Sequence, residues 1–392
     1  MLKFSRLARR HWLLLMCTAL AIGLTGCGGG GGGNGDGSGP GDGSGGGNGK
    51  GNGQGKNANS GSTKRIVILT NGPDPFWDTC EIGARDAEEE LGLADSGFKV
   101  DFHRGDFTDK KQIDMLKQYG LDPDIVAVGI SVFNPDNLPL IEEMRALQEK
   151  GVKVVTIDSD VNRDEFRDAR FAYLGTDNII GGRELGRAAK AVAPEGANFA
   201  FFVGSLGVAN AVDRMQGFVE GAGDDFQELA RRSDDGKPAE ARRNVENALN
   251  QFSELNMLVG IWAYDTPQII NVVRDRNIRD KTKVICFDAA EASIDGMMNG
   301  QVDVMVVQNP YQMGHHGVKL MHALVSEDQA VVDEMYPEYA KEGEKDVFRT
   351  ELRVVIPDSG SSISGDLFEE STILFKASEF KEWLEERSLI SS

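Results

Sequence analysis

From residue 64 onward, short apolar runs alternate with longer segments that have helical periodicity. The apolar runs carry few polar residues, which is typical of strands that are buried on both faces of a parallel sheet. Alternation of this kind predicts right-handed βαβ units. We therefore predict an α/β fold made of doubly wound parallel sheets. The expected strands cover residues 66–70, 99–103, 125–130, 153–158, 171–175, 198–203, 258–262, 284–287 and 302–307, and the clearest helices cover residues 78–91, 137–150, 179–193, 240–251 and 267–276.

The first 27 residues have the pattern of an export signal. A basic start with Lys3 and Arg6 precedes an apolar run at residues 12–24, which is short for a membrane span. The run ends in "LTGC", which resembles a bacterial lipobox and makes Cys27 the expected site of lipid attachment. A cleaved signal with an incidental cysteine and an uncleaved anchor helix are the alternatives.

Residues 28–63 are mostly Gly, with Asn, Ser, Asp and Lys. A segment of this composition cannot bury enough apolar surface to offset its conformational entropy, so we expect a flexible linker. About 330 residues remain for folded structure, enough for two ordinary α/β lobes.

Charge and cysteine content narrow the class of protein. The 392-residue chain has 42 Lys and Arg against 62 Asp and Glu, a formal net charge of −20, which argues against a nucleic-acid surface. Cys80 and Cys286 lie outside any CxxC pair, so a single disulfide and two buried thiols both remain open. No second apolar segment of membrane-spanning length appears, so membrane attachment is expected through the lipid only.

Chemistry-bearing residues gather where the predicted strands end. Ligands of open parallel sheets bind outside the carboxyl ends of the strands, so these side chains are expected to converge. Carboxylates and amides accept hydroxyl donors, arginine donates, and aromatic faces pack against C–H groups, which together suit a neutral polyhydroxylated ligand. The candidate ligand-binding residues are Asp74, Phe76, Trp77, Asp158, Asn210, Arg214, Tyr264, Asp265, Asp288 and Gln308.

The stretch "PDPFWD" at residues 73–78 places two large aromatic residues side by side after the first strand. Neighbouring helical positions point about 100° apart, so at most one of Phe76 and Trp77 should face the sheet. We expect the other ring to be left uncovered for a ligand.

Simpler interpretations compete at several positions. Asp158 and Asp288 could be capping or turn acids, and Arg214 could lie on a solvated helix face, whereas Phe218 is expected in the core. Turn chemistry explains the acids at 158–160 and 234–235 as well as a catalytic or Ca²⁺-binding role does. The five histidines form no metal-binding pattern, and neither GxSxG nor a GxGxxG after a strand is present, so we expect no metal, no cofactor and no catalytic residues.

Residues 64–357 resemble the periplasmic sugar-binding proteins of ABC transporters, in the type I, ribose-binding-like group. The resemblance lies in the order and spacing of several short motifs: "PFW", "TID", "TDNIIGG", "RMQGF", "YD", "CFDAAEAS" and "VVQNPYQMG". It implies two lobes that close on a sugar and are joined by three crossovers, near Asp177, near Gln308 and at "RTELRVVIP". The implied lobes are residues 64–176 with 309–348, and residues 177–308 with 349–392. Phe76 and Trp77 match stacking aromatics, and Asp158, Arg214, Asp288 and Gln308 match polar contact residues.

The sequence departs from the ribose binders at four places. Asp74 and Tyr264 stand where they have Asn, Ser159 stands where they have Arg, and no aromatic is found near residues 234–238. These changes leave the identity of the sugar open. The tail at residues 359–392 has no counterpart and is expected to be a strand or loop followed by an amphipathic helix packed on a lobe.

The expected function is that of a monomeric, lipid-anchored, exported protein that captures a monosaccharide or polyol by hinge closure and presents it to an ABC permease. A sensory binding protein that signals to a membrane receptor is the alternative. A secreted glycoside hydrolase, with Asp158 and Asp288 as its carboxylates, is a remote one.

Overall fold

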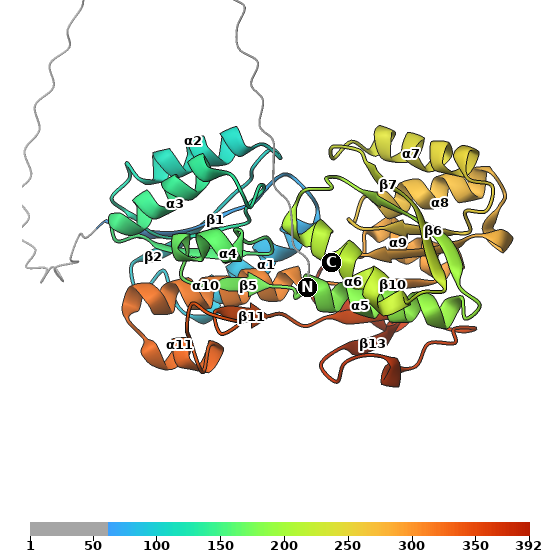
Figure 1. The fold of residues 1–392 in the computed structure, drawn as a ribbon. Helices are drawn as coiled ribbons and strands as arrows, with labels where there is room; N and C mark the ends of the chain where they lie inside the picture. Colours follow the sequence, from blue (N-terminus) through green and yellow to red (C-terminus); the bar gives the residue numbers. More distant parts are fainter. Residues whose placement is uncertain (1–61) are drawn as a thin grey trace, which may run out of the picture. The chain divides into compact units, whose positions relative to one another are not determined.

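The computed structural model describes residues 62–392 (Figure 1). The expected signal sequence, the lipid attachment at Cys27 and nearly all of the glycine-rich linker lie outside these residues. Within them, no helix combines the length and the apolar character needed to cross a membrane.

Two sheets organise the described residues. The first has six parallel strands in the order β11-β5-β4-β3-β1-β2. Its strands are β1 (Lys64–Leu69), β2 (Phe98–His103), β3 (Ile125–Ile130), β4 (Lys153–Ile157), β5 (Tyr173–Gly175) and β11 (Val347–Arg349).

The second sheet has seven strands in the order β13-β12-β10-β9-β8-β6-β7, and all neighbours are parallel except β10 and β12. Its strands are β6 (Ala197–Val203), β7 (Phe226–Ser233), β8 (Met257–Gly260), β9 (Lys283–Phe287), β10 (Val304–Val307), β12 (Arg353–Ile356) and β13 (Ile373–Lys376). The predicted α/β class with two doubly wound parallel sheets is therefore confirmed.

Helices cover both faces of each sheet (Figure 1). Along β1, Ile66 and Ile68 join one apolar cluster while Val67 and Leu69 join another, so alternate side chains are buried on opposite faces. The main helices are α1 (Phe76–Glu90), α2 (Asp109–Tyr119), α3 (Leu138–Glu149), α5 (Asn178–Val192), α6 (Ala209–Ala222), α7 (Pro238–Gln251), α8 (Asp265–Asp275), α9 (Glu291–Met298), α10 (Pro310–Ser326), α11 (Gln329–Met335) and α12 (Ala377–Glu385). A short helix, α4 (Arg163–Phe166), follows β4.

The chain passes between the two sheets three times: between β5 and β6, between β10 and β11, and between β11 and β12. We call the first sheet, with α1–α4, α10 and α11, the first lobe, and the second sheet, with α5–α9 and α12, the second lobe. Helix α10 packs against α1 and against β3 and β4, so it belongs to the first lobe although it follows β10.

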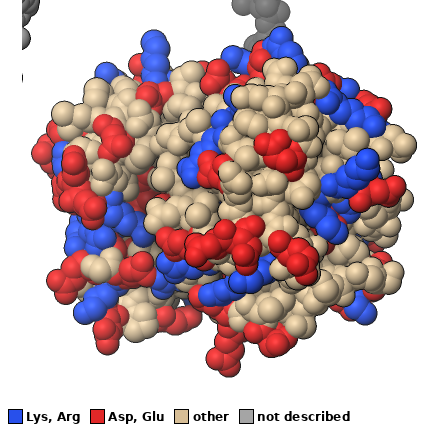
Figure 2. Space-filling model, turned by 45° about the vertical axis from the view of Figure 1, so that its right-hand side comes forward, with Lys and Arg blue, Asp and Glu red and all other residues tan. Residues whose placement is uncertain are grey.

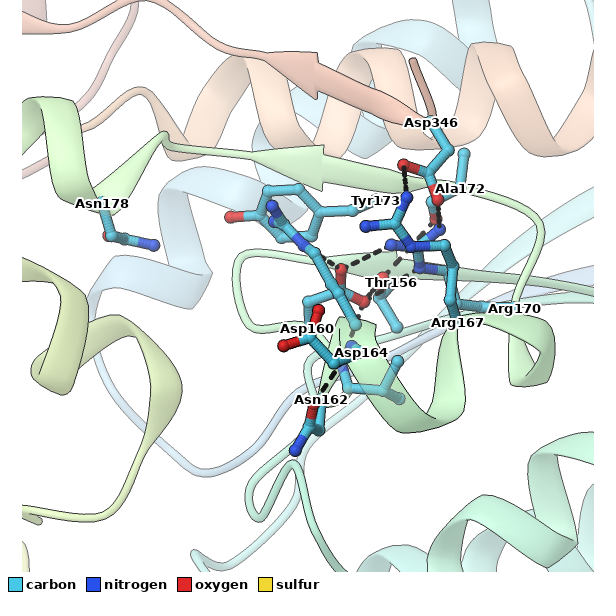
Figure 3. A network of polar contacts seen from close by, with 12 residues as sticks. Thr156, Asp160, Asn162, Asp164, Arg167, Arg170, Ala172, Tyr173, Asn178 and Asp346 are labelled. Carbon is cyan, nitrogen blue, oxygen red and sulfur yellow. Dashed lines mark hydrogen bonds and ion pairs between the residues drawn. The ribbon is translucent and has the colours of Figure 1, made fainter. Parts of the chain in front are cut away.

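A buried ion-pair network holds β11 beside β5 (Figure 3). The Arg170 guanidinium donates to Asp160, which follows β4, at 3.0 and 2.7 Å, and also to Asp346, which precedes β11. All three side chains are buried. Asp160 is therefore a structural acid, which agrees with the simpler of the two interpretations of residues 158–160.

Some elements were not predicted from the sequence. Strand β7 reads "FQELARRS" and lies at the edge of its sheet, and its charged residues conceal it from a search for apolar runs. The tail forms β13 and α12, and Phe380 and Leu384 of α12 are buried in the second lobe. The expectation of an amphipathic helix packed on a lobe is confirmed.

Candidate functional site

A cavity lies at the carboxyl ends of the strands of both sheets, with an empty volume of about 450 Å³ that includes solvent at its mouth. Volumes of this order suit small-molecule ligands. Its lining residues are Asn71, Asp74, Phe76, Trp77, Phe107, Asp158, Asn210, Arg214, Trp262, Ala263, Tyr264, Asp288 and Gln308. Nine of the ten residues expected from the sequence are among them; Asp265 is not.

Asp158 and Asp288 occupy equivalent places in the two lobes. Asp158 follows β4 and Asp288 follows β9, and both have left-handed backbones, with φ of 67° and 64°. Non-glycine residues seldom adopt this conformation, and it concentrates at functional sites. The strained turn directs each carboxylate from the end of a buried strand into the cavity.

Arg214 is fully buried and is not on the solvated helix face that was considered for it. Its Nε donates to the Asn178 side chain at 2.9 Å, and its Nη1 donates to the Ile261 carbonyl at 3.0 Å and to Asp288 at 3.3 Å. The guanidinium also lies over the Phe287 ring, 4.4 Å from its centroid. Its Nη2 has no protein partner, which leaves one donor for a ligand.

Close packing of α5 on α6 sets the position of Arg214. A Cβ added at Gly182 would lie 2.3 Å from the Arg214 carbonyl oxygen, and one added at Gly217 would lie 2.2 Å from the Ile179 carbonyl oxygen. The glycines of "TDNIIGG" and "RMQGF" therefore let the two backbones touch. The same α5 segment carries Asn178, which the sequence singled out only as part of the motif "TDNIIGG" and not as a site residue.

Gln308 pairs with Asp288 at the end of the neighbouring strand. Its Nε2 donates to Asp288 Oδ1 at 2.8 Å, while its buried Oε1 has no partner. Asp288 is thus held by Gln308 and Arg214 together, and the unpartnered Oε1 can accept a ligand hydroxyl.

Phe76 and Trp77 both line the cavity and both pack into the core of the first lobe. Their exposed fractions are 8% and 2%, so the expectation that one ring is left uncovered is wrong. The rings meet edge to face with centroids 5.0 Å apart, and the Trp77 indole N–H donates to Asn71 at 3.1 Å. Because α1 begins at Phe76, this first turn approaches both the sheet edge and the cavity, which is how both rings are buried.

Four lining residues were missed: Asn71, Phe107, Trp262 and Ala263. We predicted Trp262 at the end of a strand, but β8 ends at Gly260. The indole lines the cavity, and its N–H donates to the Asn210 side chain at 3.3 Å. Phe107 lies in the loop between β2 and α2 with a left-handed φ of 59°. Its ring packs on Gly72, where an added Cβ would come within 2.4 Å. Because Phe107 lies in a loop, no strand or helix periodicity in the sequence marks it as a cavity residue.

Asp265 lies behind the cavity wall and is fully buried. Its Oδ2 accepts from the Trp262 backbone N–H at 3.1 Å, and burial raises its pKa well above the ordinary value. The neighbouring Asp234 accepts from the Tyr264 hydroxyl, and its pKa is also raised, mainly by burial. Through these hydrogen bonds, Asp265 and Asp234 hold Trp262 and Tyr264 in position in the cavity wall.

The pKa values of all three acids that line the cavity are raised. Burial raises the pKa of Asp158 to about 7; nearby Arg214 opposes the shift and Asp288 adds to it. Burial also raises the pKa of Asp288, and the Arg214 charge opposes this shift. Burial raises the pKa of Asp74 as well, and the negative charge of Asp288 adds to that shift. Asp158 accepts from the Ser131 hydroxyl at 3.1 Å, and Asp74 accepts from the Phe76 N–H at 2.9 Å.

Cys80 and Cys286 are both buried free thiols, so the disulfide alternative is wrong. Among residues 62–392 no group of three or more His, Cys, Asp or Glu is arranged to hold a metal ion. On the face seen in Figure 2, lysine and arginine side chains lie among acidic ones.

The last residues of the tail lie behind the cavity residue Gln308 and touch both lobes. Thr79 of α1 donates its hydroxyl to the Ser391 carbonyl at 3.0 Å. Ser392 and Ala289 exchange backbone hydrogen bonds of 2.9 and 3.1 Å, and the Ser392 hydroxyl donates to the Gln308 carbonyl at 2.9 Å.

A ligand-sized cavity at the carboxyl ends of two doubly wound sheets, with three crossings between them, defines a two-lobe binding protein of the type I class. The family model of the periplasmic binding protein domain matches residues 66–329. The chain belongs to that family, as the sequence resemblance implied.

Individual relatives are distant. The chain is 20% identical over 262 residues to the fructose import binding protein FruE of Bifidobacterium longum, covering 63% of this chain and 75% of FruE. It is 22% identical over 201 residues to the ribose import binding protein RbsB of Escherichia coli, covering 50% of this chain and 61% of RbsB.

Among solved structures, GanP, a glucose-galactose binding protein from Geobacillus stearothermophilus, has a TM-score of 0.65 at 23% identity, covering 76% of this chain and 98% of GanP. This similarity establishes the fold alone.

Proposed function

We propose that this protein is the substrate-binding component of a sugar ABC importer, which captures a monosaccharide or a similar polyol between its two lobes. The observation that carries the proposal is the cavity itself. Both lobes contribute to it, and its aromatic walls surround unpartnered hydrogen-bonding atoms of Arg214 and Gln308. Hydroxyl groups pair with such atoms, and sugar C–H faces pack on such rings.

The mechanism is hinge closure. A ligand that touches residues of both lobes stabilises the closed arrangement over the open one by the difference in its contacts. Asp74 and Asp158 come from the first lobe, and Arg214 and Asp288 come from the second. Relatives named as fructose and ribose import binding proteins support the sugar assignment.

In this proposal the protein is exported, held at the cell envelope through a lipid on Cys27, and delivers its ligand to a membrane permease as a monomer. Candidate site residues act by binding and not by turnover. Turnover of glycosides that is lost in Asp158→Asn would instead support the hydrolase alternative.

Thermal unfolding in the presence of pentoses, hexoses, polyols and amino sugars tests the proposal. A ligand that binds only the folded state raises the melting temperature by mass action. At a concentration about 100 times the Kd, we expect a stabilisation of about 2.7 kcal/mol. If no compound of this panel shifts the transition, the sugar-binding proposal is wrong. Co-purification with a permease, as opposed to a receptor kinase, decides between transport and sensing.

A further inference from the structure

Negative charge exceeds positive charge among the residues that line the cavity. Three carboxylates line it, Asp74, Asp158 and Asp288, against the single guanidinium of Arg214. That guanidinium forms its ion pair with Asp288. Within residues 62–392, neither Asp74 nor Asp158 forms an ion pair, so two of the carboxylates that line the cavity have no ion-pair partner, although the more distant Arg214 charge acts on Asp158.

The wall behind the cavity contains two further acids that have no ion-pair partner among residues 62–392. Asp234 and Asp265 lie behind Tyr264 and Trp262, and neither forms an ion pair within the described part of the chain. Burial is the main cause that raises the pKa of Asp265 and of Tyr264, and the charge of Asp74 adds to both shifts. Among residues 62–392, Arg214 is the only cationic side chain that lines the cavity, against three carboxylates, so the surroundings favour a positive group inside it.

Elsewhere this fold does pair its buried acids. Asp160 and Asp346 share the Arg170 guanidinium (Figure 3). Arg163 is a further partner of Asp160. Burying a charge without a partner is costly, and the protein avoids that cost where the acids are structural. The unpaired acids lie at the cavity, where a ligand can supply the missing charge.

The remaining lining suits a cation that also carries hydroxyl groups. Aromatic rings attract cations through their faces, and five line the cavity: Phe76, Trp77, Phe107, Trp262 and Tyr264. The buried, unpartnered Arg214 Nη2 needs an acceptor oxygen, and the Gln308 Oε1 needs a donor. A simple amine offers no acceptor oxygen to the Arg214 Nη2 donor, and it does not fill the cavity.

We propose that the ligand is a polyhydroxylated molecule bearing a protonated amine, such as an amino sugar or a polyhydroxylated iminosugar, with its ammonium group between Asp74 and Asp158 and its hydroxyls at Arg214 and Gln308. This inference rests on the proposed sugar-binding function. It replaces the neutral ligand that the sequence suggested with a cationic one.

Matched pairs of ligands test the charge directly by calorimetry near neutral pH. D-Glucosamine is compared with D-glucose and N-acetyl-D-glucosamine, and D-galactosamine is compared with D-galactose. We expect each amine to bind about tenfold more tightly than its hydroxyl twin, because charge-assisted hydrogen bonds are roughly twice as strong as neutral ones. A neutral twin that binds as tightly as its amine overturns the inference and leaves the sugar-binding function standing. If the amines do not bind, the inference is wrong. If, in addition, no compound of the thermal-unfolding panel binds, the sugar-binding function is wrong as well.

Charge-neutralising variants provide the second measurement. Asp158→Asn and Asp74→Asn should each reduce the ratio of amine affinity to hydroxyl affinity by about threefold or more, even if absolute affinities fall. Asp95→Asn removes the same charge from an exposed loop and should leave the ratio unchanged. Asp74 is half-buried, so Asp74→Asn remains informative if Asp158→Asn does not fold. An unchanged ratio in Asp74→Asn and in any folded Asp158→Asn overturns the inference.

Discussion

Asp158 and Asp288 have left-handed backbones at matching strand ends, one in each lobe, and Arg214 forms an ion pair with only Asp288. Asp288 receives hydrogen bonds from Arg214 and Gln308, whereas Asp158 receives one from Ser131. The two halves of the cavity are therefore equivalent in backbone geometry and different in charge. Burial of Asp158 without an ion-pair partner among residues 62–392 gives rise to the pH dependence expected below.

Asp158 should make the protein less stable as the pH rises. Its folded-state pKa, about 7, lies above the value near 4 expected in the unfolded chain. The folded state therefore holds an extra proton between these values. The stability from this proton is fully present below about pH 4 and is lost as the pH rises through about 7. The contribution is of the order of a few kcal/mol.

Asp158→Asn isolates this contribution from the other cavity acids, whose pKa values shift in the same direction. Urea unfolding of the ligand-free protein across this pH window should show a smaller loss of unfolding free energy in the variant than in the wild type. Equal slopes would show that Asp158 ionises normally.

Trp77→Ala should cost fold stability as well as affinity. The side chain is 2% exposed in the core of the first lobe, and removing a buried Trp typically costs about 3–5 kcal/mol. Trp262→Ala is the matched control, because Trp262 is only partly buried and should lose affinity with a smaller loss of stability. Urea unfolding and calorimetry measure the two effects. If Trp77→Ala loses affinity alone, Trp77 is a stacking platform and not a core residue.

Arg214→Lys should weaken ligand binding by at least about tenfold. A lysine cannot reproduce the planar fork that reaches Asn178, Ile261 and Asp288 together. Arg183→Lys on α5 is the control, since the ion pair of Arg183 with Glu220 is exposed and such pairs contribute little. Titration calorimetry with a ligand from the panel measures both, and equal affinities in the two variants would contradict the role of Arg214.

Asp346→Ala should destabilise the fold by about 3–5 kcal/mol, because it leaves part of the buried Arg170 guanidinium without its partner. The effect should be on unfolding free energy, since Asp346 does not line the cavity. Asp280→Ala, at an exposed position without an ion pair in the described residues, should change stability by less than about 0.5 kcal/mol. If Asp346→Ala changes the unfolding free energy as little as Asp280→Ala does, the ion-pair network contributes no net stability.

The sequence predicted the parallel sheets and most of the cavity for the same reason: buried strands are continuously apolar, and polar residues that interrupt them mark strand ends. It failed where the deciding contact is tertiary. Asn178 orients Arg214 across two helices, Phe107 enters the cavity from a loop, and the charge of β7 hides an edge strand. It also misjudged Phe76 and Trp77, because a helix that begins at the sheet edge can bury both rings.

The tail contacts behind the cavity have a consequence for how fast a ligand leaves. Helix α12 anchors the tail in the second lobe, so the Ser392 bonds to Ala289 and Gln308 would move with that lobe. The Thr79–Ser391 hydrogen bond is then one that lobe opening has to break. Thr79→Val removes only this bond, and stopped-flow measurement should show ligand dissociation that is about threefold to tenfold faster. An unchanged dissociation rate would contradict this role. The tail would thus govern the residence time of the ligand from a position that the ligand never touches.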